Sequence, residues 1–528
     1  MGRDAFYLTT AIFYPSAQPA LHSLFEAIGA DALARYHRLL GDETRFLTGM
    51  DEHSANVERD ARELGIDPHE LIDPWAATWQ ATFERFGISA DRFIRTTDPD
   101  HAVAAAEMVR RAQAAGDVYE GVYSGWFCTS CNEFKTDQQL VDGRCPDHPT
   151  LQPQWLEESN HFFRLSAYQE RLERLYAENP SFCEPPHFRN EVLGWLREGL
   201  RDFSISRSGT TWGIPFPGDE RHRIYVWFDA LTNYLTGAGF PNDAAAMERW
   251  WPADLHVIGK NITRFHCLYW PAMLMSAGIP LPKRVFAHGF MLDRGGERMS
   301  KTRGNTEDPD AVADEFGVDG VRYVVLREVP FDRDADITYE GLVRRYNADL
   351  ANDLGNLVNR TVSMSGRYLE GAVPMLDASS ATPADAELRD AADRAVAAYH
   401  DAMGRLQFDE ALAAMMRLAG AANGYAESQA PWALHKAGEA ERVGQVLAHM
   451  AEACRLLGHL IAPVAPGAAR TIHEQLGTPP PYDDRGAGGP GLHGLIAWGS
   501  APGVRRTGQA APVFPRLELD AEAEESSP

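Results

Sequence analysis

The pattern of apolar positions predicts that the chain opens with a strand, a turn and a helix. Residues Ala5 to Tyr14 are rich in β-branched and aromatic side chains, which is typical of a buried strand. The segment Pro15 to Pro19 ends this strand, and apolar residues then recur at helical spacing from Leu21 to Leu40. A second short strand is predicted at Arg45 to Thr48, with helices following to about Gly116. This succession favours a parallel α/β layer.

The α/β pattern is interrupted after Gly116 and resumes beyond Pro217. Between these positions aromatic residues are scattered and long periodic runs are few, which indicates an inserted unit. Four later runs are predicted to be strands, at Ile224 to Trp227, Leu255 to Ile258, Val285 to His288 and Tyr323 to Leu326. The layer is therefore expected to have two halves with an insertion between them.

After about Arg333 the strand signals nearly vanish and helical periodicity dominates. Thr382 followed by Pro383 is typical of a helix start, because threonine caps N–H groups and proline fits the first turn. One apolar helix face is formed by Val443, Val446, Leu447, Met450, Leu457 and Ile461. The stretch 477–503 is rich in proline and glycine, and acidic residues crowd the segment from Glu518 to Glu525. We expect a helix bundle followed by a tail that is disordered in part.

These patterns divide the chain into five segments. Residues 1–115 and 218–333 are expected to form the two halves of a parallel-sheet α/β domain, and residues 116–217 the insertion. Residues 334–477 are expected to form the helical bundle, and residues 478–528 the tail.

Composition and charge exclude several classes of protein. Apolar residues make up 44% of the chain, including 24 Phe, 17 Tyr and 12 Trp, so the bulk of it is not disordered. Lys and Arg number 50 against 75 Asp and Glu, and the net charge of −25 argues against binding nucleic acid by bulk charge while leaving a local basic path open. The longest apolar stretch, Leu268 to Pro282, is broken by prolines, so we expect no membrane span. The apolar start of the chain runs into patterned sequence without a signal-peptide cleavage site, so we expect a cytoplasmic protein. We also expect the protein to be a monomer.

Three of the six cysteines, Cys128, Cys131 and Cys145, lie close together in the insertion. With His148 they form a Cys-x2-Cys pair and a Cys-x2-His pair, separated by thirteen residues. This spacing is typical of a structural Zn²⁺ site, in which four ligands complete a tetrahedron and leave no position for a substrate. Reduced thiols without a metal are the alternative.

A second candidate site is a glycine-rich loop with two cations and a hydroxyl, formed by Arg298, Ser300 and Lys301. It follows the strand that is predicted to end near Phe290. Such a loop can fold over a polyphosphate and neutralise its charge. A basic loop that is merely solvated is the alternative.

Several motifs, in a fixed order, resemble those of methionyl-tRNA synthetases, a family of class I aminoacyl-tRNA synthetases. They are Thr9 to Pro15 (TTAIFYP), Phe46 to His53 (FLTGMDEH), Tyr225 to Leu231 (YVWFDAL), Ile258 to Lys260 (IGK), Arg264 to His266 (RFH) and Arg298 to Thr302 (RMSKT), the last resembling the KMSKS signature. The resemblance runs from about Phe6 to Gln475. It implies a Rossmann-like domain with an inserted zinc knuckle, followed by an anticodon-binding-type helix bundle. It also implies ATP-dependent activation of methionine, or a related amino acid, as an adenylate that is passed to tRNA.

The resemblance also implies a role for each matching residue. The pocket for the methionine side chain would be lined by Ile12, Tyr14, Trp227, Ala230, Leu231, Tyr234, Ile262 and His266. Asp51 would hold the α-ammonium group. ATP, accompanied by Mg²⁺, would contact His22, Ser23, Gly259, Asn261 and Lys301, and Arg298, Ser300 and Lys301 would act on the phosphates. In the bundle, Asn356, Arg360 and Trp432 would read the tRNA anticodon, with Arg344, Arg345 and Arg367 near the tRNA phosphates.

The sequence departs from the family at the HIGH motif. A gap-free alignment places Ala20, Leu21, His22 and Ser23 there, so both histidines of the motif are replaced. In the family these imidazoles bind phosphate at a helix N-terminus, and the glycine gives adenine room against the backbone. Lesser departures are Asn261, Ser54 and Met50. Two alternatives therefore stay open: a biosynthetic amino-acid ligase with a non-tRNA acceptor, similar to hydrazine-forming synthetases, and a non-catalytic tRNA-binding paralogue.

Overall fold

A six-stranded parallel sheet forms the centre of the α/β half of the molecule, which the family resemblance predicts to be the catalytic half. The computed structural model describes residues 5–15, 18–128, 133–135, 137, 140–146, 151–292, 308–489, 491–500 and 505–518. The sheet order is β3-β2-β1-β12-β13-β7. Its strands are β1 (Ala5–Phe13), β2 (Glu43–Met50), β3 (Arg92–Arg95), β7 (Cys183–Glu184), β12 (Leu255–Gly259) and β13 (Val285–His288). The order reverses between β1 and β12, and ligands bind at the carboxyl ends of strands at such a switch point.

Helices cover both faces of this sheet. Those of the catalytic half are α1 (Leu21–Leu40), α2 (Ala55–Leu64), α3 (Pro68–Arg85), α4 (Pro99–Ala114), α7 (Val226–Leu231), α8 (Asn233–Gly237), α9 (Ala244–Trp250), η3 (Lys260–Ile262), η4 (Phe265–Tyr269) and α10 (Trp270–Ser276). Helix α1 is buried on nearly every side, because it lies between the sheet and helices from the later part of the chain. Its apolar run therefore predicts its bounds well.

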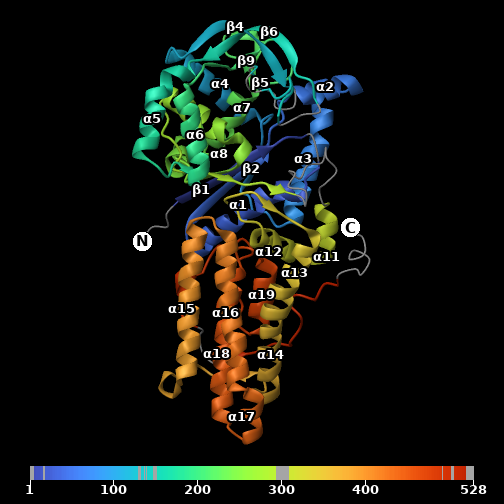
Figure 1. Cartoon of the computed structure of the whole chain (residues 1–528), viewed down its shortest axis with the longest axis vertical. Coiled ribbons are helices and arrows are strands. Elements are labelled where there is room, and N and C mark those ends of the chain that lie inside the picture. The colour runs from blue at the N-terminus through green and yellow to red at the C-terminus, as the bar shows by residue number, and fades with distance from the viewer. Residues whose placement is uncertain are drawn as a thin grey trace.

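The insertion lies at the end of the molecule opposite the bundle (Figure 1). Its antiparallel sheets have the orders β5-β4-β6-β8 and β10-β11-β9. The strands are β4 (Val118–Cys128), β5 (Glu133–Lys135), β6 (Gln154–Phe163), β8 (Phe203–Ser204), β9 (Ser206–Arg207), β10 (Pro215–Phe216) and β11 (Asp219–Ile224), and the helices are η2 (Leu165–Tyr168), α5 (Gln169–Glu178) and α6 (Pro186–Glu198). Between α5 and α6 the chain passes back to the central sheet, where β7 pairs with β13 as the edge strand. The insertion is therefore joined to the catalytic half at this edge.

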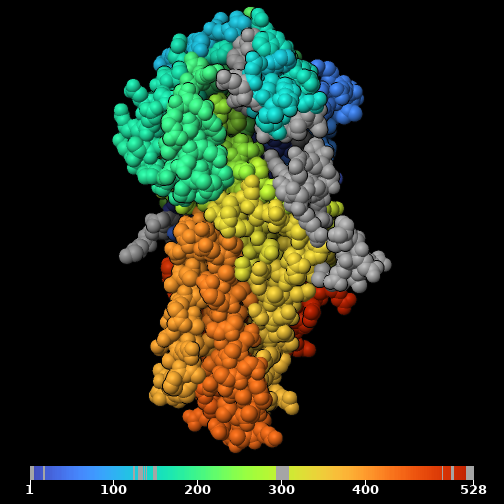
Figure 2. Space-filling view, in the orientation of Figure 1, coloured from blue at the N-terminus to red at the C-terminus, as the bar shows by residue number. Residues whose placement is uncertain are grey.

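Helices form the rest of the molecule, and the long ones extend to the end opposite the insertion (Figure 1), which the same segments fill in the space-filling view (Figure 2). They are α11 (Pro309–Phe316), α12 (Val318–Glu328), α13 (Tyr339–Arg345), η6 (Tyr346–Gly355), α14 (Asn356–Leu369), α15 (Pro383–Gly404), α16 (Phe408–Gln429), α17 (Pro431–Ala437), α18 (Ala440–Ile461) and α19 (Pro466–Gln475). Short elements complete the chain: β14 (Met291–Leu292), β15 (Ala335–Asp336), β16 (Ala372–Val373), η7 (Ala378–Ser380), α20 (Leu492–Leu495) and β17 (Arg505–Arg506). The predicted start of α15 is confirmed, because Thr382 and Asp385 form a capping box.

A buried ion pair joins the catalytic half to the helical half of the molecule. Arg322 on α12 is 1% exposed and donates a hydrogen bond of 2.6 Å to Asp31 on α1. It also donates to the carbonyl oxygens of Phe86 and Val464. Burial alone would raise the pKa of Asp31, but Arg35 and Arg322 hold it well below its usual range. Both charges are therefore compensated, as a buried pair requires.

Two predicted strands are wrong. Strand β11 ends at Ile224 and helix α7 begins at Val226, so the run to Trp227 is not a strand. The run from Tyr323 to Leu326 lies inside helix α12. Both runs are buried on all sides, and a short apolar run in a buried helix has the same composition as a buried strand. The strands predicted around β1, β2, β12 and β13 are confirmed.

Part of the predicted tail packs against the bundle. Leu492 is fully buried, Phe514 is 7% exposed, and strand β17 pairs with β16. Arg505 in this segment donates to the buried Glu452 of α18 at 2.7 Å. Residues 519–528 lie outside the described part of the chain. Among the residues that the structure describes, no helix combines the length and the apolar character needed to cross a membrane.

Candidate active site

A cavity of about 380 Å³ opens at the switch point of the sheet, where β1 and β12 end. Every predicted amino-acid contact lines it: Ile12, Tyr14, Asp51, Trp227, Ala230, Leu231, Tyr234, Ile262 and His266. Four predicted ATP contacts line it too: His22, Ser23, Gly259 and Asn261. The fold thus brings together residues that lie far apart in the sequence.

One end of the cavity has aromatic walls that are held in place by buried contacts. Trp227 stacks on Phe265, with ring centroids 3.6 Å apart and an angle of 4° between the planes. His266 Nδ1 donates to the Ile262 carbonyl at 3.0 Å, so its Nε2 accepts from the Tyr234 hydroxyl at 2.7 Å. Burial lowers the pKa of His266 to about 4, so the ring is neutral near pH 7. These walls suit an apolar side chain with a weak polar acceptor, such as a thioether.

Asp51 presents a buried carboxylate to the same cavity. The residue is 3% exposed, and its Oδ1 atom has no hydrogen-bond partner among the described residues. Burial raises the pKa of Asp51 well above its usual range, and the nearby Asp229 and Glu52 raise it further. A cationic ligand group would relieve this cost, because it compensates the charge and supplies the hydrogen bond.

The two neighbouring carboxylates already have side-chain partners. Asp229 is contacted by His53 Nδ1 and His101 Nε2, each at 2.6 Å. Burial alone would raise the pKa of Asp229, but the two histidines lower it below its usual range. Glu52 accepts from Arg95 Nε at 2.6 Å and also from Thr97. Asp51 therefore differs from its neighbours in having a side-chain oxygen left for a ligand.

The other end of the cavity is more polar and includes the N-terminus of α1. Ala20 is the N-cap, and alanine has no side-chain acceptor, while the side chains of His22 and Ser23 are half-buried. Backbone N–H groups in the first helical turn make this a general anion site. At Gly259 a Cβ atom would lie 2.8 Å from Asn261 Oδ1, so any larger residue here would require the Asn261 side chain to move.

Sequence reasoning missed Glu26 and His288, which also line the cavity. Glu26 accepts from the Ala11 backbone N–H at 2.9 Å, and its second oxygen lies 2.9 Å from His288 Nε2. His288 Nδ1 donates to the Gly289 carbonyl at 2.7 Å, which leaves Nε2 facing Glu26. The sequence does show Glu26 as an acidic residue within the apolar run of α1, and this could have indicated a functional role.

Several predicted residues lie outside the described part of the chain. They are Arg298, Ser300 and Lys301 of the basic loop, and Cys131 and His148 of the cysteine cluster. The other two cysteines are described: Cys128 is 1% exposed and Cys145 is fully buried. They lie in a small unit where Asp142, Gly143 and Arg144 are exposed, so burial of the thiols does not reflect a large apolar core.

The three predicted anticodon residues lie on α14 and α17. The Arg360 guanidinium lies 5.7 Å from the centroid of the Trp432 ring, and it donates to Glu427 at 2.7 Å. Trp432 is 39% exposed, and Asn356 is exposed at the start of α14. Helix α17 lies at the far end of the bundle from the catalytic half (Figure 1). This end therefore offers an exposed aromatic surface with a cation beside it.

Comparisons with known proteins agree with this architecture. The family described as tRNA synthetases class I (M) matches residues 6–152 and 149–362, and the anticodon binding domain of methionyl tRNA ligase matches residues 373–484. A methionine–tRNA ligase of Thermosynechococcus vestitus is 43% identical over 99% of this chain and 99% of its own length. The chain belongs to the methionyl-tRNA synthetase family.

The solved structures of the family share its fold. Mycobacterium tuberculosis methionyl-tRNA synthetase in complex with methionyl-adenylate superimposes with a TM-score of 0.91 at 44% identity, covering 97% of this chain and all of that one. The apo form of that synthetase gives a TM-score of 0.85 at 40% identity. A ligase with a non-tRNA acceptor and a non-catalytic paralogue are not favoured, because the full-length relatives are named methionine–tRNA ligases.

Proposed function

We propose that this chain activates methionine with ATP as methionyl-adenylate and transfers the methionyl group to tRNA. The observation that carries the proposal is Asp51, whose buried carboxylate faces a cavity walled by Trp227, Tyr234 and His266. A carboxylate for the ammonium group and aromatic walls for the thioether are the two features that methionine requires.

In the proposed reaction, the methionine carboxylate attacks the α-phosphorus of ATP, and pyrophosphate leaves. Asp51 would hold the ammonium group, and the aromatic walls would fix the side chain, so that the carboxylate points towards the N-terminus of α1. The protein's contribution to such a step is mainly positioning and charge neutralisation. Arg298, Ser300 and Lys301 would stabilise the departing phosphates, a role that rests on the match of this loop to the KMSKS signature.

Binding of adenine and ribose is assigned to the polar end of the cavity. His22, Ser23, Gly259 and Asn261 line this end, together with Glu26 and His288. Mg²⁺ would accompany ATP and neutralise phosphate charge. Because Ala20 and Ser23 replace two imidazoles of the family motif, we expect slower adenylate formation than with an intact motif.

We assign the structural Zn²⁺ to Cys128, Cys131, Cys145 and His148. Their donor types and spacing fit a closed tetrahedral site, and it is supported by the burial of Cys128 and of Cys145, the latter between exposed residues. Metal analysis tests the assignment: Cys145→Ser protein should contain about one zinc ion fewer per chain than the wild type. Equal zinc contents would contradict it.

tRNA would bind along the bundle, with the anticodon at Asn356, Arg360 and Trp432. The Arg360–Trp432 contact supplies an exposed ring and a cation, which together suit an unstacked base. Stacking of a base on an aromatic side chain contributes about 1–3 kcal/mol. The negative net charge of −25 is compatible with such a local contact.

The experiment separates the two steps of the reaction. Trp227→Ala and His266→Ala should weaken methionine binding, measured by calorimetry, because each removes part of the cavity wall. Trp432→Ala should raise the KM for tRNA roughly fivefold or more while leaving methionine-dependent pyrophosphate exchange unchanged. Trp155, an exposed tryptophan of the insertion at 55% exposure, provides the matched control Trp155→Ala. Unchanged methionine binding in both cavity variants would contradict the proposed function.

A further inference from the structure

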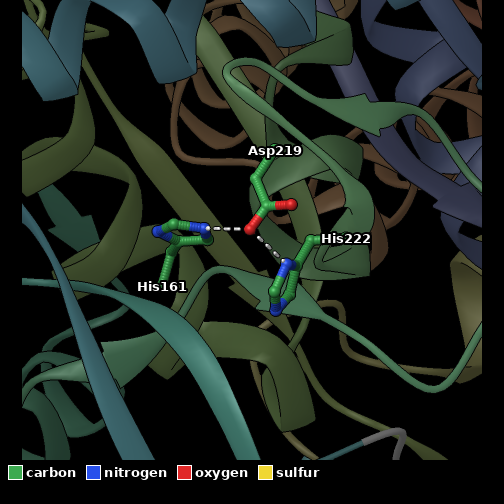
Figure 3. Close-up of side chains that lie close together, drawn as sticks. All are labelled: His161, Asp219 and His222. Atoms are coloured by element: carbon green, nitrogen blue, oxygen red, sulfur yellow. Dashed lines mark hydrogen bonds and ion pairs between the residues drawn. The ribbon is translucent and has the colours of Figure 1, made fainter.

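Two histidines and an aspartate converge in the insertion, outside the active-site cavity. His161 lies on β6, and Asp219 and His222 lie on β11 (Figure 3). One nitrogen or oxygen atom of each residue lies within 4.8 Å of those of the other two. The Asp219 Oδ2 atom is 3.5 Å from His161 Nε2 and 3.0 Å from His222 Nδ1. The two imidazoles therefore face the same carboxylate oxygen of Asp219.

The hydrogen bonds of His222 direct its Nδ1 atom at this oxygen. His222 Nε2 lies 2.9 Å from the Ser159 carbonyl oxygen, which only accepts, so Nε2 carries the proton. In the neutral ring, Nδ1 then presents its lone pair to the carboxylate oxygen of Asp219. Two acceptors facing each other at 3.0 Å are favourable only when a proton or a metal cation lies between them.

His161 offers a second nitrogen to the same point. The residue is 9% exposed, and its Nε2 atom makes no hydrogen bond to the residues that the structure describes. Its ring stacks on Phe216 with centroids 4.2 Å apart and an angle of 6°, so its orientation is fixed. A largely buried imidazole whose Nε2 atom faces a carboxylate oxygen, without a hydrogen bond to it, has the form required of a metal ligand.

We propose that His161, Asp219 and His222 bind a divalent transition-metal cation, with Zn²⁺ as the best fit. Two imidazoles and a carboxylate select Zn²⁺, Co²⁺ or Ni²⁺ over Mg²⁺ and Ca²⁺, which prefer oxygen ligands. Metal–ligand bonds of about 2.0–2.2 Å in a tetrahedron place the ligand atoms roughly 3.4 Å apart. The observed separations of 3.0 and 3.5 Å are close to this value. A water molecule would complete the coordination.

This site is separate from the cysteine cluster. Glu120 on β4 pairs with His161 across the sheet, whereas Cys128 ends the same strand. At about 3.3 Å per residue, these two positions on β4 are roughly 25 Å apart. The insertion would therefore hold one cation near each end of the paired strands β4 and β6.

Arg221 is the competitor for this cation. Its Nε and Nη2 donate to the two oxygens of Asp219, each at 2.8 Å. The Arg221 side chain is 84% exposed, and an exposed ion pair of this kind is worth little, so the guanidinium can be displaced. The cation would replace it as the counter-charge of Asp219. Removing Arg221 should therefore tighten metal binding.

The cation would join the insertion to the methionine-binding helix. His161 belongs to the large sheet of the insertion, whereas β11 leads directly into α7, which carries Trp227. A cation at this point would hold the two strands together at the base of α7. Because it would bind the folded state preferentially, it should also raise the melting temperature.

Cobalt titration of the full-length protein tests the proposal. Protein purified without chelator is dialysed, its zinc content is measured, and Co²⁺ is added to the protein at micromolar concentrations. We expect one further ion per chain, with weak visible bands and without the near-ultraviolet charge-transfer band of a thiolate ligand. His161→Phe, which retains a ring next to Phe216, and Asp219→Asn should each weaken binding by roughly a hundredfold or more.

Two control variants complete the test. His187→Phe changes an exposed histidine of the same insertion and should leave Co²⁺ affinity unchanged. Arg221→Ala should bind Co²⁺ at least as tightly as the wild type. Circular dichroism and methionine binding without added metal show whether each variant is folded, and Asp219→Asn serves as the test if His161→Phe is not.

Three results would overturn the proposal. The first is no additional Co²⁺ uptake by the wild type. The second is uptake of equal affinity in folded His161→Phe or Asp219→Asn protein. The third is uptake accompanied by a thiolate charge-transfer band, which would place the ion at cysteines. None of these results bears on methionine activation, which is measured separately by pyrophosphate exchange.

Discussion

The proposed methionine end and the proposed nucleotide end of the cavity differ in how their side chains are held. At the methionine end, Trp227 stacks on Phe265 and Tyr234 donates to His266, all of them buried. At the nucleotide end, α1 begins at an alanine cap, and the half-buried His22 and Ser23 stand where the family has glycine and histidine. We infer that the amino-acid end is preorganised, whereas the phosphate end depends more on backbone N–H groups and on the basic loop.

The largest expected effect comes from removing the charge at the methionine end. Asp51→Asn should lower kcat/KM for methionine by roughly 100-fold to 1,000-fold, because an ammonium group would be buried without its partner charge. Steady-state pyrophosphate exchange at varied methionine measures this. Asp73→Asn changes an aspartate whose side chain is 58% exposed and pairs with Arg95, and it should leave the methionine KM unchanged. Equal losses of kcat/KM in the two variants would show that Asp51 does not bind the ammonium group of methionine.

The pH dependence of binding sharpens the same assignment. In the free protein, burial, Asp229 and Glu52 raise the pKa of Asp51 well above its usual 3.8. A proton on Asp51 competes with the ammonium group, so methionine affinity should be full above the raised pKa and fall by up to about tenfold per pH unit below it. Calorimetry between neutral and mildly acidic pH tests this. In Asp51→Asn protein the dependence should disappear, and its persistence would assign the titration to another group.

Restoring the family motif tests the nucleotide end. Ala20→His, His22→Gly and Ser23→His together should raise methionine-dependent pyrophosphate exchange roughly tenfold or more, about 1.4 kcal/mol in the barrier. The expected gain comes from two imidazole donors and from room for adenine.

Ala20→Ser is the matched control for the motif. It adds a side-chain cap to α1 and should stabilise the helix by about 1 kcal/mol without adding an imidazole, so exchange should stay near the wild-type rate. If the triple variant gains nothing over a wild type as fast as ordinary synthetases, the nucleotide end is complete as it stands.

The smallest effect is expected from a single hydrogen bond at the methionine end. Tyr234→Phe removes the 2.7 Å bond to His266 Nε2 but keeps the aromatic wall. A neutral hydrogen bond contributes about 0.5–1.5 kcal/mol, so the methionine KM should rise roughly threefold to tenfold. Because the pKa of His266 is lowered to about 4, this effect should not change between pH 6 and about 8. A KM equal to that of the wild type would show that His266 is oriented by the Ile262 carbonyl alone.

The sequence predicted the elements of the catalytic half well where length and periodicity agree. Helix α1 has the predicted bounds Leu21–Leu40, and β13 has the predicted bounds Val285–His288. The runs at 224–227 and 323–326 were wrong, because a short apolar run does not distinguish a buried strand from a buried helix.

The prediction that the site residues lie in one place came from the family resemblance, not from the periodicity of the sequence. Long-range partners were beyond sequence reasoning. The contacts of Asp229 with His53 and His101, and of Glu26 with His288, join elements far apart in the chain and depend on the folded geometry. The triad of His161, Asp219 and His222 was missed for the same reason, because β6 and β11 meet only in the fold.

Pyrophosphate exchange by the wild-type protein tests the central claim most directly. The rate is measured with each of a panel of amino acids, with and without tRNA, in protein whose folding is verified by circular dichroism. We expect methionine to support the fastest exchange, without a requirement for tRNA, and at a rate below that of the variant with the restored motif. Exchange that is faster with another amino acid, or absent with methionine in folded protein, would contradict the account.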